Sequence, residues 1–94
     1  MDKEQAKAKA KNSIDQITEK IESMEQKKDE ITSDVKNEFE EQIKNLKSLR
    51  TEMRQKYDEM KQKTDARWED AQEAFSRASN KFEQGFSELK ELVN

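Results

Sequence analysis

The chain has 94 residues, of which 30% are hydrophobic and 44% are charged. This composition excludes a conventional globular core and leaves either disorder or long helices with a narrow apolar seam. Cysteine and histidine are absent, which excludes disulfides, Cys/His zinc sites and Ser-His or Cys-His nucleophiles. The net charge of −3 is small for so many charges, so no overall field draws the chain to nucleic acid or anionic lipid.

Helix is the structure that the composition favours. Proline is absent, Gly85 is the single glycine, and Glu, Lys, Gln, Ala and Arg are abundant; these residues lose little side-chain freedom in a helix. The chain contains no stretch of about 20 apolar residues that could cross a bilayer, and no apolar targeting segment is visible. We therefore expect a soluble, cytoplasmic protein.

The first segment, residues 1–12, is expected to be frayed. Beyond Met1 its apolar side chains are Ala6, Ala8 and Ala10, which alternate with lysines and give a helix no consistent buried face. Asn12 or Ser13 can cap the first helical turn with its side-chain oxygen. Residues 13–94 are then predicted to form a single helical coiled-coil domain.

A heptad seam follows, with Ile14, Ile17, Ile21 and Met24 at steps of three, four and three residues. Lys28 occupies the next seam position before Ile31 resumes the pattern. We expect the stem of Lys28 to lie along the apolar stripe with its ammonium in water, which weakens the seam locally.

After Val35 the period changes to eleven residues. Three rows of one helical face show it: Val35, Leu46, Tyr57 and Trp68; Leu49, Met60, Ala71 and Phe82; and Met53, Thr64, Phe75 and Phe86. Eleven residues over three turns give about 3.67 residues per turn, which keeps the stripe on one side of a nearly straight helix. Ile43, Ala78 and Leu89 complete the seam.

The stretch "KTDARWED" decides between two architectures. Thr64 or Asp65 could cap a new helix, with Glu69 and Asp70 near its positive N-terminal end. That predicts an all-α fold in which a long helix and a shorter C-terminal helix form an antiparallel hairpin with a turn near residues 63–66. The alternative is one continuous helix, because the eleven-residue register passes through Thr64 without glycine or proline. In the hairpin Trp68 packs at the elbow over Tyr57 or Met60.

Both architectures leave apolar seam uncovered, so we expect a homodimer or higher oligomer, or another helical protein as partner. The sequence indicates no catalytic residue, cofactor site, metal site or small-molecule substrate. The predicted interface consists of Ile14, Ile17, Ile21, Met24, Ile31, Val35, Phe39, Ile43, Leu46, Leu49, Met53, Tyr57, Met60, Trp68, Ala71, Phe75, Ala78, Phe82, Phe86 and Leu89.

Two segments, "DVKNEFEEQIKNLKSLRTEMRQKYDEM" and "KTDARWEDAQEAFSRASNKF", carry a family resemblance. The chain resembles, over roughly residues 14–90, small bacterial coiled-coil proteins described as stress-response proteins of the cyanobacterial type. The matching positions are Phe39, Glu41, Ile43, Leu46, Ala66, Trp68, Glu69, Asp70 and Phe82. The resemblance implies a stress-linked helical protein without a known catalytic site.

The resulting functional prediction is a non-enzymatic coiled-coil protein that self-associates or acts as a scaffold, with a stress-protective role implied by the resemblance. The alternative is a helix that binds a lipid surface through the aromatic face of residues 68–89, although the narrow stripe suits a helix seam better. A basic run from Lys44 to Lys63 raises nucleic-acid binding, but Glu52, Asp58 and Glu59 interrupt it and argue against that partner.

Overall fold

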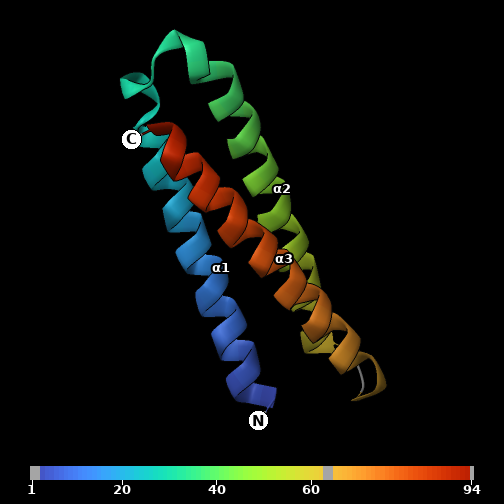
Figure 1. Ribbon diagram of the computed structural model, residues 1–94. Helices are drawn as coiled ribbons and strands as arrows, with labels where there is room; N and C mark the ends of the chain where they lie inside the picture. The colour runs from blue at the N-terminus through green and yellow to red at the C-terminus, as the bar shows by residue number, and fades with distance from the viewer. Residues whose placement is uncertain (1–2, 63–64, 94) are drawn as a thin grey trace.

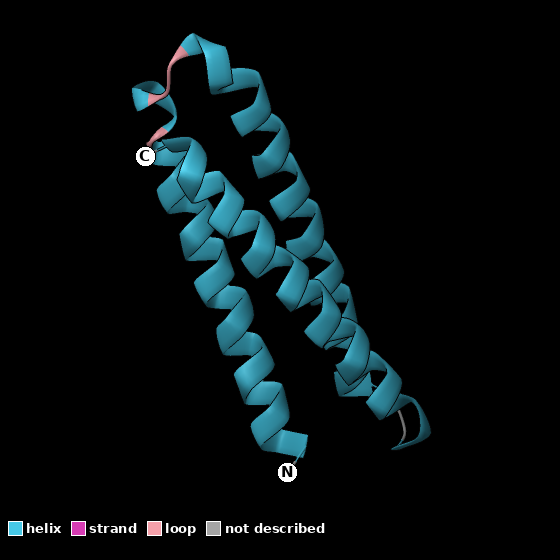
Figure 2. Cartoon of the chain, viewed as in Figure 1, coloured by secondary structure: helices cyan, strands magenta, loops and turns pink. Residues whose placement is uncertain are grey.

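The computed structural model describes residues 3–62 and 65–93, and for residues 65–67 the backbone alone. Its helices are α1 (Lys3–Gln26), α2 (Ser33–Gln62) and α3 (Asp65–Val93), and a short 3-10 turn, η1 (Lys28–Glu30), connects the first two. The described residues include no strand (Figure 2). The chain runs up α1, down α2 and up α3 (Figure 1), so α2 is antiparallel to both neighbours in a bundle of 49 × 17 × 16 Å.

Helix α1 begins at Lys3, and the prediction of a frayed segment is therefore wrong for residues 3–12. Ala6 and Ala10 are 8% and 4% exposed, whereas Ala8 faces water. Residues four apart share one face of a helix, so Ala6 and Ala10 extend the buried stripe of Ile14 by two turns. Burial of that stripe, rather than local helix propensity, stabilises this end of the helix.

The chain reverses between α1 and α2, where the sequence predicted an uninterrupted helix. Helix α1 ends at Gln26, and Ile31 adopts an extended conformation with φ −93° and ψ 135°. Lys28, the charged residue in the seam, is exposed and pairs with Glu40 at 3.2 Å. The single long arm is thus divided in two, because folding back buries the isoleucines of α1 within the same chain.

The antiparallel hairpin of α2 and α3 confirms the predicted all-α hairpin and excludes the continuous helix. Residues 63 and 64 lie outside the described part of the chain, as does the side chain of Asp65, so the predicted caps there are not described. A row of small residues, Ala71, Ala78 and Gly85, recurs every seven positions on one side of α3. Gly85 in this row lies against Leu46 of α2, which lets the two backbones approach closely.

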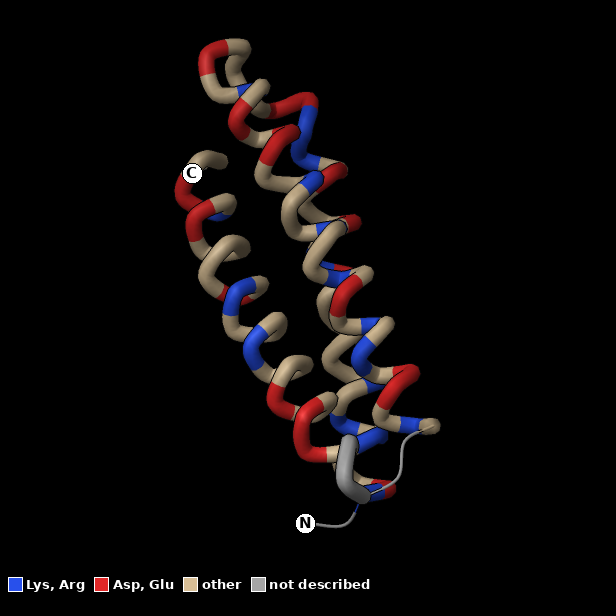
Figure 3. Tube along the Cα trace, turned by 90° about the vertical axis from the view of Figure 1, so that its right-hand side faces the viewer, with Lys and Arg blue, Asp and Glu red and all other residues tan. Residues whose placement is uncertain are grey.

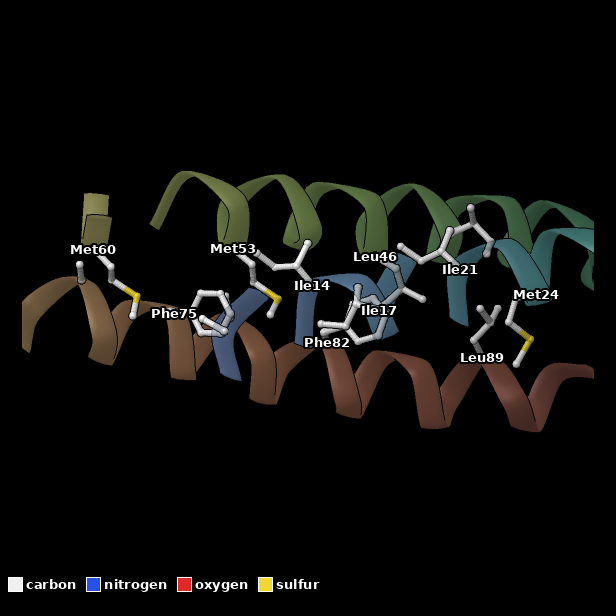
Figure 4. Close-up of a cluster of buried hydrophobic side chains, with 14 of the residues drawn as sticks. Ile14, Ile17, Ile21, Met24, Leu46, Met53, Met60, Phe75, Phe82 and Leu89 are labelled. Atoms are coloured by element: carbon white, nitrogen blue, oxygen red, sulfur yellow. The ribbon is translucent and has the colours of Figure 1, made fainter. Parts of the chain in front are cut away.

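The core runs along the axis of the bundle between all three helices (Figure 4). Its most completely buried large side chains are Ile21 of α1, Phe39, Leu46 and Met53 of α2, and Phe82 and Leu89 of α3. Among the described residues no polar or charged residue is buried as a whole. Hydrophobic burial alone therefore holds the interior together.

Candidate interaction surface

The predicted interface residues are placed inside a single chain. The buried ones are Ile14, Ile17, Ile21, Met24, Phe39, Ile43, Leu46, Met53, Met60, Trp68, Ala71, Phe75, Ala78, Phe82 and Leu89. The half-buried ones are Ile31, Val35, Leu49, Tyr57 and Phe86. The burial that the sequence assigned to a second chain is thus supplied by the chain's own helices.

Sequence reasoning missed four residues of this interior. Ala6 and Ala10 are buried, and Leu92 and Val93 are half-buried against the core. The signal was present in each case: Ala6, Ala10 and Ile14 follow four-residue steps, and Leu92 and Val93 follow Leu89 by three and four residues. Such steps place side chains on one helical face.

A groove between α2 and α3 holds the apolar stripe of α1, and we call it the α1 groove. Ile14, Ile17 and Ile21 reach from α1 into a layer formed by Met53, Leu46 and Phe82, as Figure 4 shows. Met24 lies beside Leu89 at the end where α3 finishes. The groove therefore accepts a helix whose apolar side chains are spaced by three and four residues. This spacing is the pattern by which hydrophobic grooves bind amphipathic helices.

Charged residues at the rims connect α1 to both neighbours. The Lys20 ammonium lies 3.2 Å from the carboxylate of Glu83 on α3, and Lys47 of α2 forms an ion pair with Glu25. All four side chains are substantially exposed, and an exposed pair contributes at most about 1 kcal/mol. These contacts align α1 along the groove more than they stabilise it.

Trp68 has a structural role at the other end of the bundle. It is 7% exposed and belongs to the same core cluster as Tyr57 and Met60. The ammonium groups of Lys3 and Lys7 lie 5.6 and 6.0 Å from the centre of its ring. The first two turns of α1 thus cover the face of this indole, through contacts of the cation–π type.

Among the described residues, a cleft opens near each end of α1. The larger, about 490 Å³, has Phe39 and Ile43 at its base and the side chains of Glu25, Lys28, Glu40, Lys44 and Lys47 around it. Ion pairs already join Lys28 to Glu40 and Lys47 to Glu25. The smaller, about 200 Å³, separates Ala6 and Ala10 from Met60 and Phe75. In the described part of the chain no cluster of three or more potential metal ligands occurs.

Several lysines of the basic run on α2 pair with nearby acidic residues. Lys56 lies 3.2 Å from Glu59, and Lys61 lies 3.5 Å from Asp58. Arg50 is half-buried, and Lys63 lies outside the described residues. Figure 3 shows Lys, Arg, Asp and Glu mixed along the helices. A continuous phosphate-binding track needs uninterrupted positive charge, so this surface does not favour nucleic acid.

The fold and these surfaces define the chain as an antiparallel three-helix bundle. Comparison with protein-family models, with curated proteins and with solved structures finds no match. The resemblance to bacterial stress-response proteins therefore stays a prediction. Within residues 3–62 and 65–93, no helix contains a long enough apolar stretch to cross a membrane.

Proposed function

We propose that this chain is a non-enzymatic helical protein that self-associates and serves as a scaffold through helix–helix packing. The observation that carries the proposal is the composition of its interior, which contains whole helix seams and no buried polar or charged residue among those described. An interior of this kind recognises a partner through apolar shape and burial rather than through reaction chemistry.

The α1 groove supports the same proposal because it already binds one helix. Its occupant presents three isoleucines and a methionine at steps of three and four residues, and a helix of similar pattern from another chain would meet the same walls. The stress-protective role rests on the family resemblance. In that role the scaffold would bind helical segments that other proteins expose.

Binding to a lipid surface is the second candidate, supported by the line of large apolar residues on α3. Trp68, Phe75, Phe82 and Leu89 lie on one face of that helix but are all buried. Lipid could reach them only after α1 and α2 had moved away, so this function requires the bundle to open.

Sedimentation equilibrium from micromolar to millimolar concentration tests the proposal directly. We expect dimers or larger assemblies to accumulate with concentration without any loss of the helix content measured by circular dichroism. A chain that remains monomeric throughout would contradict self-association. The same samples with anionic vesicles test the second candidate, because Trp68 would then move to the lipid and its emission would shift.

A further inference from the structure

We propose that self-association proceeds by exchange of α1 between two copies of the chain. In the exchanged form residues 27–32 become helical, α1 and α2 join into one helix, and the α1 of each chain occupies the α1 groove of its partner. This inference rests on the proposed function and specifies its mechanism. Exchange of an identical element is a low-cost route to a symmetric dimer, since each interface already exists in the monomer.

The helical register allows the two stripes to merge. Ile17 and Leu46 each lie at the centre of their buried faces and are 29 residues apart. At about 100° per residue, their directions on one continuous helix differ by about 20°. Joining α1 to α2 would therefore place both stripes on the same side of one rod, where a second rod can cover them.

The connector offers little resistance to this change. Residues 27–30 are exposed and include neither proline nor glycine. No side-chain hydrogen bond caps the turn at Lys27, and the backbone bonds across it are short-range, such as Glu30 N–H to the Lys27 carbonyl at 3.0 Å. A continuous helix would replace them with regular helical hydrogen bonds, which form readily once flanking helix exists.

Each chain recovers from its partner the packing that opening of its own bundle removes. Because α1 is antiparallel to α2, two extended chains aligned antiparallel restore the same neighbours. Glu25 of one copy would meet Lys47 of the other, and Lys20 would meet Glu83, as they do within the monomer. The dimer then differs from two monomers chiefly in the connector, so concentration decides between them.

The exchanged dimer has a distinct length. The monomer extends 49 Å along its longest axis, whereas a continuous helix from Lys3 to Gln62 is about 90 Å long at 1.5 Å per residue. Size-exclusion chromatography with small-angle X-ray scattering measures this length on the unaltered chain. A dimer formed by side-by-side docking of closed bundles would be shorter and thicker.

A proline at residue 33 separates the two forms. Ser33 is the first residue of α2, a position that accepts proline in the closed monomer. In the middle of a continuous helix the same proline removes a hydrogen bond and collides with the preceding turn. We expect Ser33→Pro to weaken dimerisation more than about ten-fold with monomer helix content unchanged, and the matched Ser33→Ala variant to dimerise like the wild type.

Cross-linking gives an independent measurement that does not depend on the proline variant folding. The natural chain lacks cysteine, so chains carrying Glu25→Cys can be mixed with chains carrying Lys47→Cys, incubated at millimolar concentration and treated with a short bis-maleimide. Exchange predicts covalent heterodimers. A control mixture of Glu25→Cys and Asp70→Cys chains joins opposite ends of the bundle and should give none.

The outcomes separate this inference from the proposed function. A dimer of about 90 Å that Ser33→Pro suppresses and that cross-links through residues 25 and 47 supports exchange. Dimers that form equally in the proline and alanine variants, without the cross-link, overturn exchange and leave self-association standing. A wild-type chain that stays monomeric at every concentration overturns both.

Discussion

Gly85 of α3 lies directly against Leu46 of α2, because a Cβ added at Gly85 would stand 3.0 Å from Leu46 Cδ2. Both residues are in the middle of regular helix, where glycine costs about 1 kcal/mol relative to alanine. The glycine therefore serves close packing rather than a turn. It holds together the α2–α3 hairpin, which forms the walls of the α1 groove.

A large side chain at this position should separate α2 from α3. We expect Gly85→Leu to lower the free energy of unfolding by about 1–3 kcal/mol, the usual cost of overpacking, measured by urea denaturation. Gln84 is the exposed neighbour on the same helix, so Gln84→Leu is the control and should change stability little. Equal effects of the two variants would mean that α2 and α3 leave room for a side chain at residue 85.

Truncation of an α1 anchor tests whether this helix belongs to the cooperative core of the monomer. Ile17 is 2% exposed, and Ile17→Ala should cost about 2–5 kcal/mol through lost burial and the cavity left behind. The exposed neighbour Gln16 provides the control Gln16→Ala. Dilute samples should unfold with a midpoint independent of concentration. A midpoint that falls on dilution would show instead that a second chain buries Ile17.

The two stacked phenylalanines of α3 should contribute unequally. The rings of Phe82 and Phe86 lie 6.0 Å apart with an interplanar angle of 11°, but Phe82 is fully buried and Phe86 is half-buried. We expect Phe82→Ala to cost about 3–5 kcal/mol and Phe86→Ala distinctly less. Thermal unfolding followed by circular dichroism measures both. A larger loss from Phe86 would require that residue to be covered by something outside the monomer.

The lysines above Trp68 should stabilise the N-terminal end of α1. Replacing Lys3 and Lys7 together by glutamine removes both cations from the indole face and should cost about 0.5–1 kcal/mol for each contact. Lys11→Gln is the control, because Lys11 is exposed on the same helix. The single tryptophan makes its fluorescence a direct reporter of unfolding at this end. Identical unfolding midpoints in the wild type and both variants would show that the two cations do not stabilise this end.

The hairpin of α2 and α3 could be predicted because helix signals and burial agree there. Glu69 and Asp70 follow the start of α3, and Trp68, Phe75, Phe82 and Leu89 give it an apolar face. The amino-terminal half of the bundle was harder to predict from the sequence. Lys28 marked a weak point in the seam, but neither glycine nor proline specified a reversal. The reversal is decided by burial of Ile14, Ile17 and Ile21, a tertiary effect that local sequence does not encode.

Local sequence patterns also could not predict which chain covers the apolar face. Each predicted interface residue is buried or half-buried, so the apolar face was found. Which chain covers that face depends on whether a turn at residues 27–32 is more stable than a straight helix. Those two conformations differ in a few exposed residues, in the half-buried Ile31 and in one exposed ion pair, Lys28 with Glu40. Such small differences are not resolved by periodicity.

The interior of the described bundle provides no wholly buried polar residue to fix how far α1 slides along its neighbours. The sizes of the buried side chains set that position, together with the ion pairs of Lys20 and Glu25 at the rims. The buried side chains of α1 become larger along the helix, from Ala6 and Ala10 through the isoleucines to Met24. A shift by one turn would move Ile14 beside the cleft at Ala10 and bring Glu25 to the buried position of Ile21. Because burial of that charge is costly, the limited length of the apolar stripe fixes α1 at one position along its neighbours.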